Sequence, residues 1–145
     1  MPKQIPITPI YDRDDLVEML DAEYKMLLDH VEDLSEEQLR WKLHPKAHGI
    51  LDILWHLAYE PKKHPRPKDK KEALARLKAW YEEWREKAQD QNFLAQSLTW
   101  HTGETITQHG LLRGFAIRHL AYHYGQVIAL RQAMGVEAGK FYHEE

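Results

Sequence analysis

Apolar residues recur every three or four positions over most of the chain, which is the spacing of one face of an α-helix. The pattern predicts principal helices over residues 13–34, 49–60, 71–90 and 106–134. A capping box from Ser35 to Gln38 predicts a further short helical turn that runs towards Trp41. No alternating strand pattern and no hairpin pattern is found. The sequence therefore predicts an all-α fold in which the principal helices form a four-helix bundle.

Residues at the ends of these segments have helix-ending roles. Asp12 is a predicted N-cap, Thr105 to Gln108 form a second capping box, and Gly135 is the expected left-handed terminator. Pro61 ends the second helix because it has no backbone N–H. The core is expected at Leu16, Leu20, Tyr24, Leu27, Val31, Leu34, Ile50, Ile53, Leu54, Leu57, Leu74, Leu77, Tyr81, Trp84, Ala88, Leu112, Phe115, Ala116, His119, His123, Val127, Leu130 and Met134.

Length and composition fit a single globular domain over residues 1–145, with an N-terminal extension over 1–11 and a Pro/Lys-rich linker over 61–71. The chain has no cysteine, which excludes disulfides and thiolate ligands and suits a reducing cytoplasm. It has neither a secretory signal pattern nor a run of roughly 20 apolar residues. We expect a soluble cytoplasmic protein with no membrane partner.

The formal net charge is −3, so no overall positive field attracts nucleic acid. The one basic cluster is the 61–71 linker, which could be a phosphate-contacting patch or a solvated connection. No aromatic residue interleaves it to stack on a base, which favours the solvated linker. We expect no nucleic-acid partner.

Two histidines interrupt the apolar stripe of the last helix. Because His119 and His123 are four residues apart, both imidazoles project from the same side and can reach one ion. Burying two imidazoles without partners costs a few kcal/mol, so the pair needs compensation. The alternatives are a divalent metal ion or hydrogen bonds across the bundle.

A third histidine, His56, lies beside the apolar positions of the second principal helix. Three neutral imidazoles from two helices would leave open positions on a divalent ion, as catalytic sites do. The spacing also resembles the H-E-x-x-H motif of zinc proteases, but Leu120 occupies the position of the catalytic glutamate. The sequence therefore disfavours a metalloprotease.

Other polar residues near these histidines have two interpretations each. Glu60 is a candidate general base or fourth ligand, or else the last solvated residue of its helix. Asp52 could orient His56 or be an exposed helix acid, and Gln126 could contact a metal-bound water or another helix. His30 is expected to be a core or boundary residue rather than a ligand. The tryptophans could line an apolar substrate pocket, although the spacing of two of them favours core packing: Trp41, Trp55, Trp80, Trp84 and Trp100.

The stretches "HLAYHYGQV" and "IALRQAMGV" resemble the C-terminal signature of the DinB/YfiT-like superfamily, and "LSEEQLRWKLHPKAHGILDILWHLAYE" resembles its second-helix region. The resemblance covers about Leu34 to Val136. It implies an up-down-down-up four-helix bundle, often a homodimer, that binds a divalent metal through His56, His119 and His123. Zinc or nickel is the expected metal, with iron or manganese as alternatives. The family often has an acidic residue five positions after the first histidine, whereas Glu60 falls at four.

Members with assigned activities include transferases and isomerases that use low-molecular-weight thiols. The resemblance therefore favours a small-molecule substrate, such as a low-molecular-weight thiol, and a metal-dependent transferase, whereas the residues alone equally allow a hydrolase. A non-catalytic metal-binding or structural bundle is the alternative hypothesis. A helical dimerisation module, in which the histidines pair with acids across an interface, is a third.

Overall fold

The computed structural model describes residues 13–58 and 64–137, and this part of the chain is mostly helical. The predicted N-terminal extension over 1–11, the Asp12 cap, Glu60 and Pro61 lie outside the described residues. The all-α class is confirmed for the described part. Its helices are α1 (Arg13–Asp29), α2 (Glu36–Arg40), α3 (Ile50–Ala58), α4 (Lys70–Ala88), α5 (Gln91–Leu94), α6 (Gln108–Leu111), the π-helix η1 (Leu112–Ile117) and α7 (Arg118–Ala133). None of these helices is long and apolar enough to cross a membrane.

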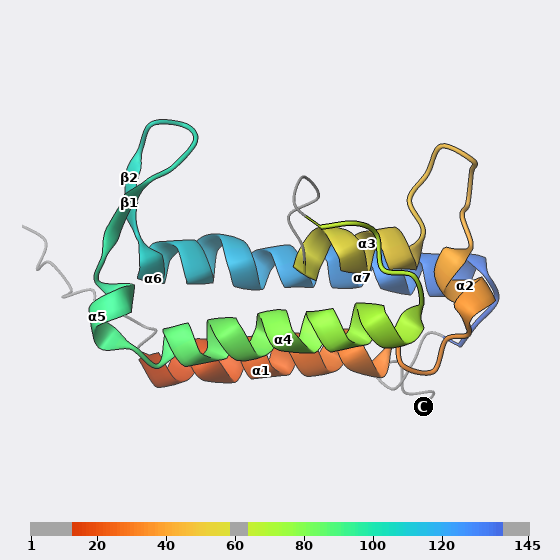
Figure 1. Ribbon diagram of the computed structural model, residues 1–145, viewed down its shortest axis with the longest axis horizontal. Coiled ribbons are helices and arrows are strands. Elements are labelled where there is room, and N and C mark those ends of the chain that lie inside the picture. Colours follow the sequence, from red (N-terminus) through yellow and green to blue (C-terminus); the bar gives the residue numbers. More distant parts are fainter. Residues whose placement is uncertain (1–12, 59–63, 138–145) are drawn as a thin grey trace, which may run out of the picture.

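The long helices pack around one hydrophobic core. Figure 1 shows α1 and α4 along one side of the molecule and α3 with the α6–η1–α7 segment along the other. Contacts of α3 with α4, and of α1 with α7, join the two sides. Most predicted core positions are fully or nearly fully buried, including Leu16, Leu20, Leu27, Val31, Leu34, Ile50, Ile53, Leu54, Leu57, Leu77, Ala88, Leu112 and Val127. The three-and-four spacing therefore identified the core-facing side of α1, α3 and α4.

Two of the predicted helix-ending motifs form as expected. The Ser35 hydroxyl accepts a hydrogen bond from the Gln38 backbone N–H at 3.1 Å, and the Gln38 side chain accepts one from the Ser35 N–H at 2.9 Å. Gly135 has a φ of +75°, the left-handed conformation that ends a helix. The predicted capping box at Thr105 is wrong, because Thr107 is the N-cap and accepts from the Gly110 N–H at 3.0 Å.

A β-hairpin stands where the sequence predicted none. Strands β1 (Ser97–Thr99) and β2 (Thr105–Thr107) pair antiparallel, with Leu98 opposite Ile106. The Trp100 N–H donates to the Glu104 carbonyl at 2.8 Å, and Gly103 has a φ of +88° in the short loop between them. A three-residue loop with glycine in the left-handed position is a common hairpin connection. Threonine-rich runs on both sides of Gly103 were the overlooked evidence.

The π-helix changes which side of the last segment is buried. Phe115 was predicted in the core but is 45% exposed, whereas Leu120 and Arg131, which were not predicted there, are 0% and 3% exposed. A π-turn contains one residue more than an α-helical turn, so the residues before it are offset by about one position, roughly 100°. The predicted single stripe assumed an uninterrupted α-helix, so it misplaced Phe115, which lies within η1. Leu120 and Arg131 lie in the regular helix α7, where the buried side is wider than predicted.

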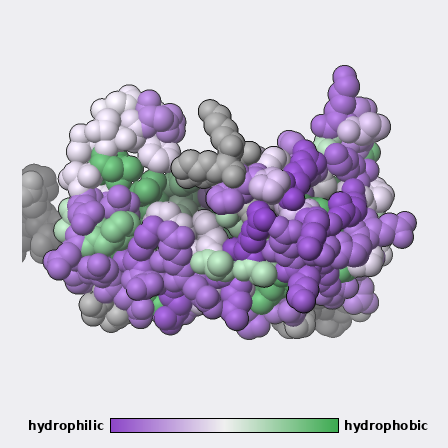
Figure 2. Space-filling view, viewed as in Figure 1, coloured by the Kyte–Doolittle hydropathy of each residue, from purple (hydrophilic) through white to green (hydrophobic). Residues whose placement is uncertain are grey.

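The surface over α4 is predominantly hydrophilic, and hydrophobic side chains reach the surface mainly near the base of the hairpin (Figure 2). Figure 1 shows that the hairpin and the loop between α2 and α3 project from the same side of the molecule, at opposite ends. The α3–α7 contact, which brings His56 towards His119 and His123, lies between these projections.

Candidate metal centre

The three histidines predicted as metal ligands come together between α3 and α7. The Nε2 atom of His119 lies 3.0 Å from Nε2 of His56 and 2.8 Å from Nε2 of His123. One ring nitrogen from each residue lies within 4.8 Å of the others, so this group could hold a metal ion. His56 is exposed, His119 is partly buried and His123 is buried. The predicted convergence of imidazoles from two helices is therefore confirmed.

Local packing fixes the position of α3, and hence of His56. A Cβ atom at Gly49 would lie 2.9 Å from the Trp41 carbonyl oxygen and 3.3 Å from that of Leu39. The close contact between the start of α3 and the end of α2 thus requires glycine. Asp52 receives a hydrogen bond from the Gly49 N–H at 3.0 Å, which satisfies a free donor at the start of α3.

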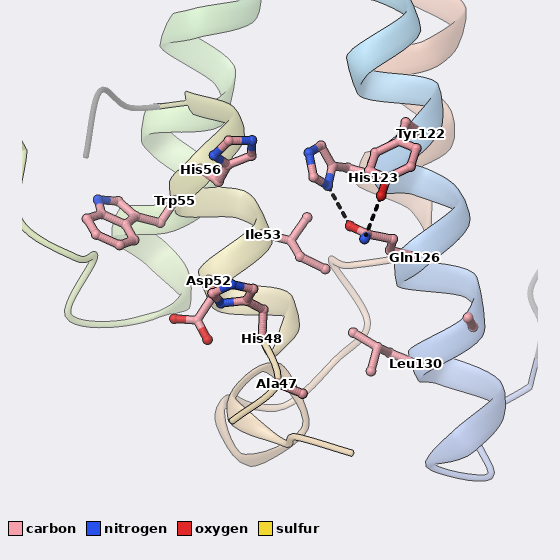
Figure 3. Close-up of a pocket in the computed structure, with 11 residues that line it drawn as sticks. Ala47, His48, Asp52, Ile53, Trp55, His56, Tyr122, His123, Gln126 and Leu130 are labelled. Atoms are coloured by element: carbon pink, nitrogen blue, oxygen red, sulfur yellow. Dashed lines mark hydrogen bonds between the residues drawn. The ribbon is translucent and has the colours of Figure 1, made fainter. Parts of the chain in front are cut away.

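Gln126 determines which nitrogen of His123 is free to bind. The Nδ1–H of His123 donates to the Gln126 side-chain oxygen at 2.6 Å (Figure 3). A neutral imidazole carries one proton, so Nε2 of His123 then presents a lone pair. Gln126 was expected to contact either a metal-bound water or another helix, whereas it accepts a hydrogen bond from His123, a candidate ligand on its own helix.

The Nε2 cluster has too few protons to satisfy its own contacts. Because Nε2 of His123 is an acceptor, a proton on Nε2 of His119 can be donated to His123 or to His56, but not to both. A cation among the three nitrogens would satisfy all the lone pairs that point at it. The donor set therefore fits a divalent ion.

Burial favours the neutral form of His119 and of His123, which is the form that binds metal. Desolvation, reinforced by His123 and His56, lowers the pKa of His119 to about 4. Desolvation also lowers the pKa of His123, and the Gln126 hydrogen bond partly opposes this shift. Near neutral pH the His119 imidazole is therefore uncharged, so no imidazolium has to lose a proton before a cation binds.

The nitrogen separations are close to those of a coordinated ion. With zinc–nitrogen bonds of about 2.0–2.1 Å, tetrahedral geometry places two ligand nitrogens about 3.4 Å apart. The separations of 2.8 and 3.0 Å would have to widen by only about half an ångström. Small side-chain rotations suffice for this.

An aromatic wall covers one side of His119, and the sequence did not predict it. The ring of Phe115 stacks on the imidazole with centroids 4.9 Å apart and an interplanar angle of 21°. Trp100, at the end of β1, packs against Phe115 at 5.2 Å. The hairpin and the π-helix, neither of them predicted, together build this wall.

The remaining candidate residues have structural roles. Asp52 neither orients His56 nor projects freely into solvent: its side chain is 10% exposed and pairs with Arg66 at 2.5 Å. His30 is buried in the core, where its Nδ1–H donates to the Met26 carbonyl at 2.7 Å, and it lies outside the histidine cluster. Trp80 and Trp84 pack against the core as expected.

The described part of the 61–71 linker is docked rather than simply solvated. Pro67 is buried, and Arg66 both pairs with Asp52 and lies over the Trp55 ring at 5.1 Å. The Arg40 guanidinium donates to the Lys68 carbonyl at 2.6 Å. Residues 64–69 are therefore docked against the helices at Pro67 and Arg66, while most of them remain exposed as expected of a linker.

No protein-family model and no curated protein sequence matches this chain.

Proposed function

We propose that this chain is a metalloprotein that binds one divalent ion through His56, His119 and His123. The observation that carries the proposal is the cluster of three Nε2 atoms whose contacts cannot all be satisfied by imidazole protons. Zinc or nickel is the proposed metal, with iron or manganese as alternatives, because neutral imidazole suits all of them.

The proposal includes membership of the DinB/YfiT-like superfamily and its up-down-down-up four-helix bundle. Two features support it: the histidine spacing followed by Gly125 and Gln126, and the chain directions in Figure 1, where α1 and α7 run one way and α3 and α4 the other. A homodimer is a further expectation from the same resemblance, and the lack of cysteine is the reason for expecting a cytoplasmic location.

We propose a metal-dependent enzyme, either a transferase acting with a low-molecular-weight thiol or a hydrolase. A divalent ion held by three histidines would supply Lewis-acid chemistry, by lowering the pKa of a bound water towards about 7 or by binding a thiol as its thiolate. Gln126 holds His123 in the tautomer with a free Nε2, and Phe115 limits movement of the His119 ring. Glu60 remains the predicted general base, outside the described residues.

Elemental analysis of purified protein tests the metal site. The wild type is expected to retain close to one equivalent of metal after removal of loosely bound ions, and His56→Ala, His119→Ala and His123→Ala are each expected to lose it. His101→Ala, at the exposed hairpin tip, is the matched control and should keep it. Equal metal contents in all five proteins would refute the site.

A second measurement separates the enzyme from a non-catalytic metal-binding bundle. In an enzyme, an exchangeable ligand such as azide should perturb the visible spectrum of the cobalt-substituted protein, because three protein ligands leave positions open. A spectrum unchanged by azide would favour a closed structural site. In that case metal removal should lower only the thermal stability.

A further inference from the structure

A pocket of about 590 Å³ adjoins the histidine cluster in the cleft between α3 and α7. His56 and His123 lie at one end, and Ala47 and Leu130 lie at the other (Figure 3). This volume falls within the roughly 300–1,000 Å³ typical of small-molecule sites. His119 does not line the pocket, and its ring stacks on Phe115. The cluster can therefore be approached from this cleft.

The wall of the pocket is predominantly apolar. Ile53 projects from α3 and Leu130 from α7 towards the space between the helices (Figure 3). Ala129, a small residue of α7, also lines the pocket. The Tyr122 ring, 64% exposed, stands beside His123 with ring centroids 5.0 Å apart. Contact with such surfaces favours apolar groups, because their transfer from water is worth about 25 cal/mol per Å².

The pocket has no uncompensated charge among its described lining residues. Asp52 is the one carboxylate in this lining, and it pairs with Arg66 at 2.5 Å and with Lys42 at 3.7 Å. A charged group placed away from the histidine cluster would lose hydration without gaining a free charged partner in this lining. Among the other polar side chains of this lining, His56, His123 and Gln126 lie at one end, and the exposed His48 lies at the other end beside Asp52 (Figure 3).

We propose that this pocket binds an uncharged, mainly apolar molecule, alkyl or aromatic, that carries one electron-donating group at the end nearest the histidines. The inference rests on the proposed metal function and narrows it. A hydrophilic thiol would find little to bond in this cleft, so the apolar molecule is the second substrate of a transferase or the substrate of a hydrolase.

A pair of hydroxamates tests the proposal with a constant metal-binding group. Titration calorimetry on the zinc-loaded protein should give benzohydroxamate an affinity at least about tenfold higher than acetohydroxamate, because the phenyl ring buries more apolar area. Ala129→Phe should reduce this preference to about twofold by filling the pocket. Ala133→Phe, one helical turn further on the exposed side of α7, is the matched control and should leave it unchanged. Equal affinities of the two compounds, or an unaltered preference in Ala129→Phe, would overturn the proposal.

Fluorobenzene, which has no metal-binding group, separates failure of the pocket from failure of the metal site. Fluorine NMR on metal-free protein should detect saturable binding that Ala129→Phe abolishes and Ala133→Phe preserves. If zinc does not load but this pattern appears, the metal function fails and the apolar pocket stands. If zinc loads and neither fluorobenzene binding nor the phenyl preference appears, the pocket proposal fails and the metal function stands.

Discussion

Replacing Gln126 by leucine tests whether the second sphere of the candidate metal centre is built as described. The substitution keeps a side chain of similar size but removes the oxygen that accepts from His123 Nδ1–H at 2.6 Å. His123 is 8% exposed, so water cannot readily replace the lost acceptor. Leaving a buried donor unsatisfied costs about 1–3 kcal/mol.

The consequence for metal binding follows from the tautomer. Without Gln126, the proton of His123 is no longer held on Nδ1, and the Nε2-protonated form competes with metal binding. A cost of about 1–3 kcal/mol corresponds to a loss of about 5- to 150-fold, and second-sphere partners of metal-bound histidines typically contribute 10- to 100-fold. We therefore expect zinc affinity to fall by about 10- to 100-fold in Gln126→Leu.

Competition against a chromophoric zinc chelator gives the dissociation constants. Gln126→Glu retains an acceptor and should bind at least as tightly as the wild type. Gln132→Leu, on the exposed side of the same helix, controls for the added apolar side chain. Circular dichroism of the metal-free proteins checks that all the variants fold. If Gln126→Leu folds and binds zinc as tightly as Gln132→Leu, the proposed role of Gln126 is wrong.

Three further substitutions test other parts of the structure. Asp33→Asn should lower the unfolding free energy by about 1 kcal/mol and make it depend less on pH in the acid range. The hydrogen bond from Arg131 lowers the pKa of Asp33, so the stabilisation by the Asp33 carboxylate is fully present above the ordinary carboxyl pKa. It is lost as the pH falls through the lowered pKa of the folded protein. An unchanged acid limb in urea titrations would contradict this. Gly103→Ala should lower the unfolding free energy by about 1–2 kcal/mol, because φ is +88° and an added Cβ disfavours this conformation. Equal stability in thermal unfolding would contradict the left-handed conformation at Gly103. Phe115→Ala should weaken zinc binding several-fold in the chelator assay, through a less ordered His119, and an unaltered affinity would remove the aromatic wall from the site.

The sequence predicted the cluster of three histidines because its evidence was local. His119 and His123 face the same way in any α-helix at that spacing, and His56 lies next to residues whose burial was already expected, Ile53 and Leu57. Only the pairing of α3 with α7 was needed to bring the three together. The resemblance to the DinB/YfiT-like superfamily implies the same three residues, and the spacing of the histidines predicts them without it.

Other features depended on contacts between distant segments and could not be predicted locally. Asp52 offers the same carboxylate whether it orients a histidine or pairs with Arg66, and only the docking of residues 64–69 against α3 decides between them. The helical periodicity did not predict that Arg131 is buried. Its side chain is nevertheless buried and donates to the His30 carbonyl at 3.0 Å and to the Asp33 carboxylate at 2.6 Å. A charged residue can be buried when its donors are matched, which residue type alone does not reveal.

The π-helix and the β-hairpin, which the sequence did not predict, meet beside the histidine cluster. In an uninterrupted α-helix, Leu112, Phe115 and His119 would lie on one stripe, and Phe115 would be a core residue. The extra residue of the π-turn leaves Leu112 in the core while Phe115 moves to the surface, where it meets Trp100 from the hairpin and stacks on His119. The π-turn thus allows residues 112–117 both to fill the core, through Leu112, and to cover the His119 imidazole, through Phe115. The other two histidines, His56 and His123, line the pocket in the cleft between α3 and α7.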